Sequence, residues 1–222
     1  MPFIKAEAPF IFKTQLSLVE TMGLKARDLV ELNYYLKEVP ESSVYHHTHH
    51  FLQQHQYLTP EPPNDFAYWI ANVLQEDEMG EKIAAIDTVQ FGTLEALRGA
   101  LVGAIEEYLA KHKALRKAPE GEEFHFMKSI RFILPTVYSA SDLGEFLDCL
   151  THISPSCLYN HIFGARLRPP LGESDFSNWL KNSLGETELA GKIERLDPYT
   201  YTMEGLRKKI IHLIEKRLER DR

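Results

Sequence analysis

Two stretches of alternating apolar and polar residues predict two β-strands. The apolar positions of the first stretch are Phe10, Phe12, Leu16 and Leu18, set against Lys13, Gln15 and Ser17. Those of the second are Phe124, Phe126, Ile130, Phe132 and Leu134, set against Ser129 and Arg131. A period of two places the apolar side chains on one face of a half-buried strand. A helix is the alternative for the first stretch, because Phe12, Leu16, Val19 and Gly23 also fit helical spacing.

Helices are predicted after each strand. Apolar residues recur at helical spacing from Leu29 to Val39 and from Leu143 to Ile153. Asn64 and Ser174 then stand where a side chain can accept the free backbone amides of a new helix. The last helix of each half, at 93–109 and 202–218, is long and amphipathic. These patterns favour a mainly α (α+β) protein.

The second half of the chain repeats the first. The residues Phe10, Phe12, Asp28, Tyr45, His47, Asp65, Trp69, Leu97 and Arg98 align with Phe124, Phe126, Asp142, Tyr159, His161, Asp175, Trp179, Leu206 and Arg207. A repeat of this length suits a duplicated domain. We therefore expect two tandem, internally duplicated helical subdomains, each opening with a short strand, packed around a pseudo-twofold axis. Their predicted bounds are 1–112 and 124–222, with a linker at 113–123, and pairing of the opening strands would form one small sheet.

Composition narrows the function classes. The 222 residues carry a formal net charge of −7 with dispersed acidic residues, so no broad basic face for nucleic acid is predicted. No signal peptide pattern or membrane-spanning apolar run is found, so we expect a cytoplasmic protein without a membrane partner. The two cysteines, Cys149 and Cys157, lack metal or redox spacing and are expected to be reduced thiols.

The segment from Ser43 to Leu58 holds half of the histidines. If this segment is a helix, one side carries His46, His49, His50, Gln53 and Tyr57, and the apolar side carries His47. His47 returns in the repeat as His161, whereas His46 becomes Asn160. We therefore predict that His47 and His161 are buried and hydrogen-bonded, for example to Asp65 and Asp175.

The other histidines are the candidates for a metal-binding or catalytic site. His46, His49 and His50 are expected to line one exposed or pocket-facing surface, where imidazoles at i and i+4 can hold a divalent transition metal such as zinc. Candidate ligand-binding residues are Gln53, Tyr57, Arg166 and Arg168. No catalytic residue is identified, because the glutamate of H-E-x-x-H, a phosphate-binding glycine loop, a nucleophile elbow and a Rossmann fingerprint are all missing from the sequence. Whether the protein is an enzyme is left open.

Several longer motifs carry a resemblance to a known family. They are His46–Leu58, Pro60–Trp69, Pro119–Phe126, Asn178–Leu180 and Leu196–Thr200. With these motifs the chain resembles a family of bacterial and archaeal proteins of unknown function over nearly its whole length. The shorter pattern Ser-x-x-Tyr-x-His followed by Asp-Phe-x-x-Trp is similar to small helical modules attached to larger bacterial proteins. That similarity implies an accessory or regulatory task.

Two functions are therefore predicted as alternatives. The first is a non-catalytic helical adaptor or regulatory module that binds a protein partner or itself, forming a homo-oligomer. The second is a metal-dependent hydrolase or ligand-binding protein that uses the face of His46, His49 and His50.

Overall fold

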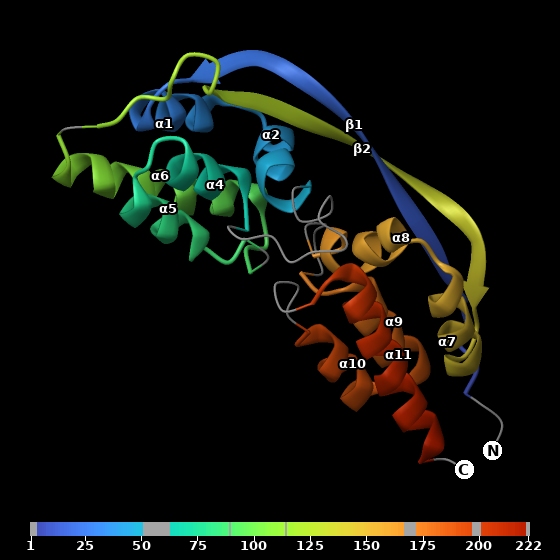
Figure 1. The fold of residues 1–222 in the computed structure, drawn as a ribbon. Coiled ribbons are helices and arrows are strands. Elements are labelled where there is room, and N and C mark those ends of the chain that lie inside the picture. Colours follow the sequence, from blue (N-terminus) through green and yellow to red (C-terminus); the bar gives the residue numbers. More distant parts are fainter. Residues whose placement is uncertain are drawn as a thin grey trace. The chain divides into compact units, whose positions relative to one another are not determined.

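The protein has a mixed α+β fold, in which a two-stranded sheet accompanies two series of helices (Figure 1). The computed structural model describes residues 4–50, 63–88, 90–113, 115–166, 172–196 and 201–220. The first series is β1 (Phe10–Ala26), α1 (Leu29–Glu38), α2 (Glu41–Tyr45), the π-helix η1 (His46–His50), α4 (Asp65–Asn72), α5 (Asp77–Ala84) and α6 (Leu94–Lys111). The second is β2 (Phe124–Ala140), α7 (Leu143–His152), α8 (Pro155–Tyr159), the π-helix η2 (Asn160–Gly164), α9 (Asp175–Leu184), α10 (Thr187–Glu194) and α11 (Met203–Glu219). Both predicted strands are confirmed.

β1 and β2 pair along their lengths and run in opposite directions, as Figure 1 shows. The Thr136 hydroxyl donates to the backbone carbonyl of Phe12 at 2.8 Å. Further along the strands, Lys128 Nζ lies 2.9 Å from Glu20 Oε2. Both contacts fit one antiparallel register. The prediction that the two opening strands pair into one small sheet is confirmed.

Each strand divides between two compact units. The first, here called the α1–α6 unit, contains the described residues between Ser17 and Arg131. The second, the α7–α11 unit, contains the described residues up to Leu16 and from Phe132 onward. The start of β1 therefore belongs with the helices that follow β2, and the start of β2 belongs with the helices that follow β1.

Aromatic packing fixes this exchange of strand starts. In the α7–α11 unit, the ring of Phe12 lies 5.3 Å from that of Phe146 and 6.0 Å from that of Phe176. In the α1–α6 unit, Phe124 lies 5.1 Å from Phe66 between ring centroids. The units thus differ from the predicted bounds 1–112 and 124–222, which kept each strand start with its own repeat. The difference arises because strands of 17 residues extend past one helical layer, so their two ends pack against different helices.

The strands do not keep one apolar face along their length. Phe12 is buried and so is Gln15, three positions later, which breaks the alternation. Beyond the break, the predicted core positions are exposed: Leu16, Leu18, Ile130, Phe132 and Leu134. The prediction that they share a buried face with the phenylalanines is therefore wrong. Strand twist and the shift at Gln15 turn these side chains away from the helices.

Both tryptophans anchor a strand start. Trp69 and Trp179 are buried, as predicted. The indole N–H of Trp69 donates to the Glu122 carbonyl at 2.8 Å, and that of Trp179 donates to the Ala8 carbonyl at 3.2 Å. Each acceptor lies two residues before a strand begins, so the indole fixes the entry of the strand into the unit.

Side chains also form hydrogen bonds with the backbone groups at helix ends that have no partner within the helix. The predicted caps are confirmed, since Asn64 accepts from the amide of Ala67 and Ser174 accepts from that of Ser177. At the opposite helix end, Nη1 of the buried Arg98 donates to the Val39 carbonyl at 2.6 Å, beyond the end of α1. Such bonds occupy carbonyl groups that have no partner within a helix.

Two substitutions in β1 test the exchange of strand starts. Phe12→Ala removes a fully buried ring and is expected to lower the free energy of unfolding by about 3–5 kcal/mol. Lys13→Ala changes the neighbouring position, where the side chain is exposed, and is expected to change the free energy of unfolding by less than about 0.5 kcal/mol. Urea denaturation measures both. Equal effects would contradict the packing of the strand start in the α7–α11 unit.

Candidate functional site

The histidine-rich segment forms a π-helix, η1, directly after α2. All five residues from His46 to His50 are buried. His46, His49 and His50 therefore do not lie on an exposed surface, and the alternative that they face a pocket stays a prediction. The expectation of an exposed surface assumed α-helical sorting at 100° per residue, and the wider π-helical turn does not follow it. Gln53 and Tyr57 lie outside the described residues.

His47 joins a helix to a strand. Its Nδ1 lies 2.8 Å from Asp65 Oδ2 on α4, and its Nε2 accepts the backbone amide of Met127 on β2 at 3.0 Å. Because Nε2 accepts a hydrogen bond, the neutral ring carries its proton on Nδ1 and donates it to the carboxylate. Both ring nitrogens are therefore used within the α1–α6 unit.

The second unit contains the same arrangement. His161 Nδ1 lies 2.7 Å from Asp175 Oδ2, and the Lys13 amide of β1 donates to His161 Nε2 at 2.7 Å. The predicted burial of His47 and His161 and their bonds to Asp65 and Asp175 are confirmed. The recurrence in both units indicates a structural role for these histidines.

His46 contacts the same strand through its side chain. Its Nδ1 lies 2.8 Å from the Ser129 hydroxyl oxygen. The pKa of His46 is lowered to about 4, mainly by burial and in addition by His47 and His50, against an opposing effect of Asp65. The ring is therefore neutral at pH 7. In the other unit, Asn160 takes this position and donates to the Lys13 carbonyl at 3.1 Å.

His49 is held by its own helix. The Thr48 hydroxyl donates to the Val44 carbonyl, so its oxygen accepts from His49 Nδ1 at 3.0 Å. The His49 ring stacks on that of Tyr45, with 5.7 Å between centroids. Burial lowers the pKa of His49 to about 3, with a smaller effect from the charge of Arg131.

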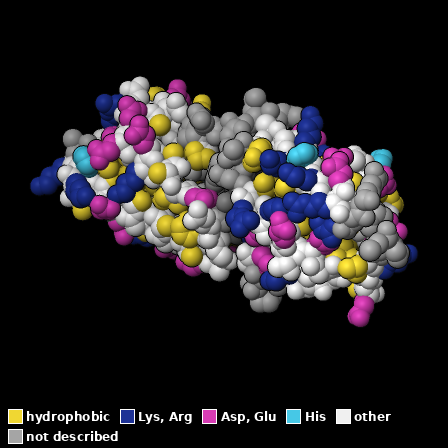
Figure 2. Space-filling model, turned by 90° about the horizontal axis from the view of Figure 1, so that it is seen from below, with side chains coloured by type: hydrophobic (Ala, Val, Ile, Leu, Met, Phe, Trp, Pro, Cys, Tyr) yellow, Lys and Arg dark blue, Asp and Glu magenta, His cyan; other side chains and the backbone are white. Residues whose placement is uncertain are grey.

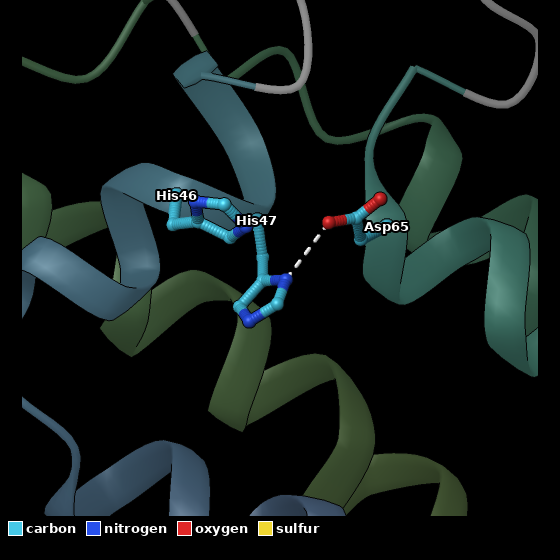
Figure 3. A group of neighbouring side chains, drawn as sticks. All are labelled: His46, His47 and Asp65. Carbon is cyan, nitrogen blue, oxygen red and sulfur yellow. Dashed lines mark hydrogen bonds and ion pairs between the residues drawn. The ribbon is translucent and has the colours of Figure 1, made fainter. Parts of the chain in front are cut away.

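Three of these side chains come close enough to be considered as metal ligands. Among the described residues, potential ligand atoms of His46, His47 and Asp65 lie within 4.8 Å of one another (Figure 3). Of the predicted ligands, only His46 belongs to this group. If Nδ1 of His47 bound a metal, the remaining ring proton would sit on Nε2 and face the Met127 amide, placing two donors together. The hydrogen bonds therefore fit the protein without a metal better than with one.

The side chain of Arg166 contacts residues of its own unit. Its Nη2 lies 2.8 Å from Glu194 Oε1 and donates to the Glu194 carbonyl at 2.8 Å. Its guanidinium carbon lies 5.9 Å from the centroid of Phe163. Arg166 thus connects the end of η2 to α10. Arg168, the other predicted ligand-binding arginine, lies outside the described residues.

The sequence did not indicate which groups of β2 form hydrogen bonds with the histidines. Ser129 and the backbone amide of Met127 lie about eighty residues after their histidine partners. Ser129 stands at a polar position of the predicted β2 pattern and aligns with Gln15 of β1, so the alternation did not indicate that either residue is buried. Both residues are buried.

The chain belongs to a known protein family. The chain is a member of a family of unknown function (DUF5752), whose model matches residues 7–215. The predicted resemblance to a family of unknown function is therefore confirmed. No protein of curated function matches the chain.

Among solved structures, the chain is similar to OrfY from Thermoproteus tenax. The two share 28% sequence identity, and the match covers 96% of each chain with a TM-score of 0.82. None of the helices described in the structure is both long and apolar enough to cross a bilayer.

Acidification is expected to destabilise the α1–α6 unit through His46. Its pKa is about 4 in the folded protein against 6.5 ordinarily, so the unfolded chain takes up the proton first. The stability that depends on the neutral ring is present above pH 6.5 and is lost as the pH falls toward 4. His46→Asn, which introduces the amide found at Asn160, is expected to make the thermal unfolding midpoint less dependent on pH.

The exposed His125 of β2 provides the control. His125→Asn removes one histidine without changing a buried group. The thermal unfolding midpoint of this variant should depend on pH in the same way as that of the unsubstituted protein. Equal pH dependence of the His46→Asn and His125→Asn proteins would contradict the assignment.

Proposed function

We propose that the protein is a non-catalytic helical module that associates with a second copy of itself through one face of the β1–β2 ribbon. The observation that carries this proposal is the exposed apolar side chains in the middle of the ribbon. Leu16, Phe132 and Leu134, all in the α7–α11 unit, are 57%, 51% and 45% exposed. Exposed apolar patches of this kind mark interaction surfaces.

The register of the strands supports a single apolar face. The contacts of Phe12 with Thr136 and of Glu20 with Lys128 imply that Leu16 lies opposite Phe132. Opposed residues of antiparallel strands point to the same side of the sheet, so Leu16 and Phe132 share a face within the α7–α11 unit.

A second copy suits this face for two reasons. Leu16 and Phe132 are both apolar, so this face carries no charge that would repel the same face of a second copy. A twofold dimer needs such a self-complementary patch. In addition, a two-stranded sheet with an apolar face gains stability from further packing. Because the patch is small beside the roughly 1,600 Å² of a standard interface, we expect a concentration-dependent dimer.

Duplication of an ancestral module would explain the two units. It is supported by the recurrence of the element order, of the histidine–carboxylate–amide arrangement and of the tryptophan bond to the strand entry. The histidine residues that differ between the units are also bound internally. This supports a binding role over a catalytic one. The pseudo-twofold relation of the repeats stays a prediction.

Sedimentation velocity over a range of concentrations tests self-association. The purified protein is expected to form a dimer, and Phe132→Glu is expected to raise its dissociation constant at least tenfold by placing a charge in the face. Tyr34→Glu is the control, because Tyr34 is an exposed aromatic residue of α1 and not of the ribbon. The proposal would be overturned if the protein stays monomeric, or if Phe132→Glu leaves the dissociation constant of the dimer unchanged. The face would then be a candidate site for a different protein.

The second candidate function is metal-dependent hydrolysis or ligand binding. It is favoured by the convergence of His46 with His47 and Asp65. Elemental analysis of the protein purified without a histidine tag separates the two functions. We expect less than one bound zinc, manganese, iron or nickel ion per chain. One ion per chain that disappears in His46→Asn would favour the metal-dependent function instead.

A further inference from the structure

A small basic cavity lies in the α7–α11 unit, between the start of α10 and the last turns of α11. Its volume is about 170 Å³. The cavity is lined by Gly185, Glu186, Thr187, Glu188, Leu189, Lys192, Leu213, Lys216, Arg217 and Arg220. Four cationic side chains and two carboxylates therefore surround it. On the face shown in Figure 2, Lys and Arg side chains gather over this unit.

The equivalent position of the α1–α6 unit is occupied by a side-chain carboxylate. Lys192 aligns with Lys82, and Arg220 aligns with Lys111. Between these two lysines lies the carboxylate of Glu107, with Oε2 2.5 Å from Lys82 Nζ and Oε1 2.7 Å from Lys111 Nζ. The hydrogen bonds from Lys111 and Lys82 lower the pKa of Glu107 to about 2. This position thus holds a carboxylate between two cations.

A second pair of contacts supports the equivalence of this cavity in the α7–α11 unit and the Glu107 position in the α1–α6 unit. Tyr108 donates to Glu76 Oε2 at 2.9 Å in the α1–α6 unit. Arg217, which aligns with Tyr108, donates from Nε to Glu186 Oε2 at 2.8 Å. The neighbouring helix termini are therefore joined in the same way in both units.

In the α7–α11 unit the internal anion is replaced by a cation. Lys216 stands where the other unit has Glu107, and Thr187 stands where it has Asp77. Glu188 is 2.6 Å from Lys192 but 3.8 Å from Arg220, and its side chain is 70% exposed. An exposed pair of this kind contributes little and is readily exchanged. The cations are thus kept, but the carboxylate that contacts them comes from the exposed side chain of Glu188 on α10 and no longer from α11. A bound anion would displace Glu188 from Lys192 and Arg220.

We propose that this cavity binds the phosphate group of a small phosphorylated ligand, which takes the place that Glu107 occupies in the other unit. Lys192, Lys216 and Arg220 supply the positive charge, and Arg220 offers a planar donor group suited to phosphate oxygens. The Thr187 hydroxyl and the backbone amides of the first turn of α10 lie beside them. The lining has a net charge of +2, which balances a phosphate dianion better than a single carboxylate.

Isothermal titration calorimetry on the full chain tests the site with inorganic phosphate and with phenyl phosphate. The ionic strength is held constant with potassium chloride, because screening alone changes exposed ion pairs. We expect saturable binding of both probes at one site per chain, with phenyl phosphate at least as tight because its ester oxygen can face solvent. Lys216→Glu, which restores the charge found at Glu107, is expected to weaken binding at least tenfold.

Lys209→Glu is the matched control. It makes the same charge change on the exposed side of α11, and Lys209 does not line the cavity. Its affinity for phosphate should stay within twofold of that of the unsubstituted chain. Equal weakening by Lys209→Glu and Lys216→Glu would show a general charge effect and overturn the site. The absence of saturable phosphate binding would also overturn it.

Discussion

The hydrogen bond from a strand amide to a buried neutral imidazole is the interaction on which each unit depends. His47 and His161 accept a strand N–H on one side and donate to an aspartate at the start of a helix on the other. A ring protonated on both nitrogens has no acceptor for the amide. The strand starts are thereby tied to helices from the other half of the chain. The surrounding aromatic rings pack the same strand starts against the same helices.

Features set by neighbouring residues could be predicted from the sequence. The caps at Asn64 and Ser174, the buried tryptophans and the burial of His47 all follow from local patterns or from the repeat. The partner of His47 on the strand could not be predicted, because Met127 contributes only a backbone amide, which any residue except proline provides. The exposure of Leu16 and Phe132 was also missed, since alternation gives the period of a strand but not the position where its buried face ends.

The histidine cluster shows a further limit of sequence reasoning. A run of five residues with four histidines suggests metal binding by composition alone. In the alignment of the two repeats, His46 corresponds to the amide of Asn160 and His49 to an aromatic residue, Phe163, so two of the three positions have a side-chain counterpart, whereas His50 corresponds to Gly164. A further difference lies elsewhere, at the charges around Lys216. A comparison of the two units is thus more informative about function than the frequency of a residue type.

The exchange of strand starts has a consequence for synthesis of the chain on the ribosome. The helices α1 to α6 leave the ribosome before β2, yet Phe124, Phe126 and the Met127 amide complete their core. The first unit must therefore wait for residues that are translated after its last helix, whereas Phe10 and Phe12 are made early and wait for α7 and α9. Nascent chains with a solvent-accessible core attract chaperones and aggregate more readily. Translation speed across the 113–123 segment thus sets how long the first half of the protein stays incomplete.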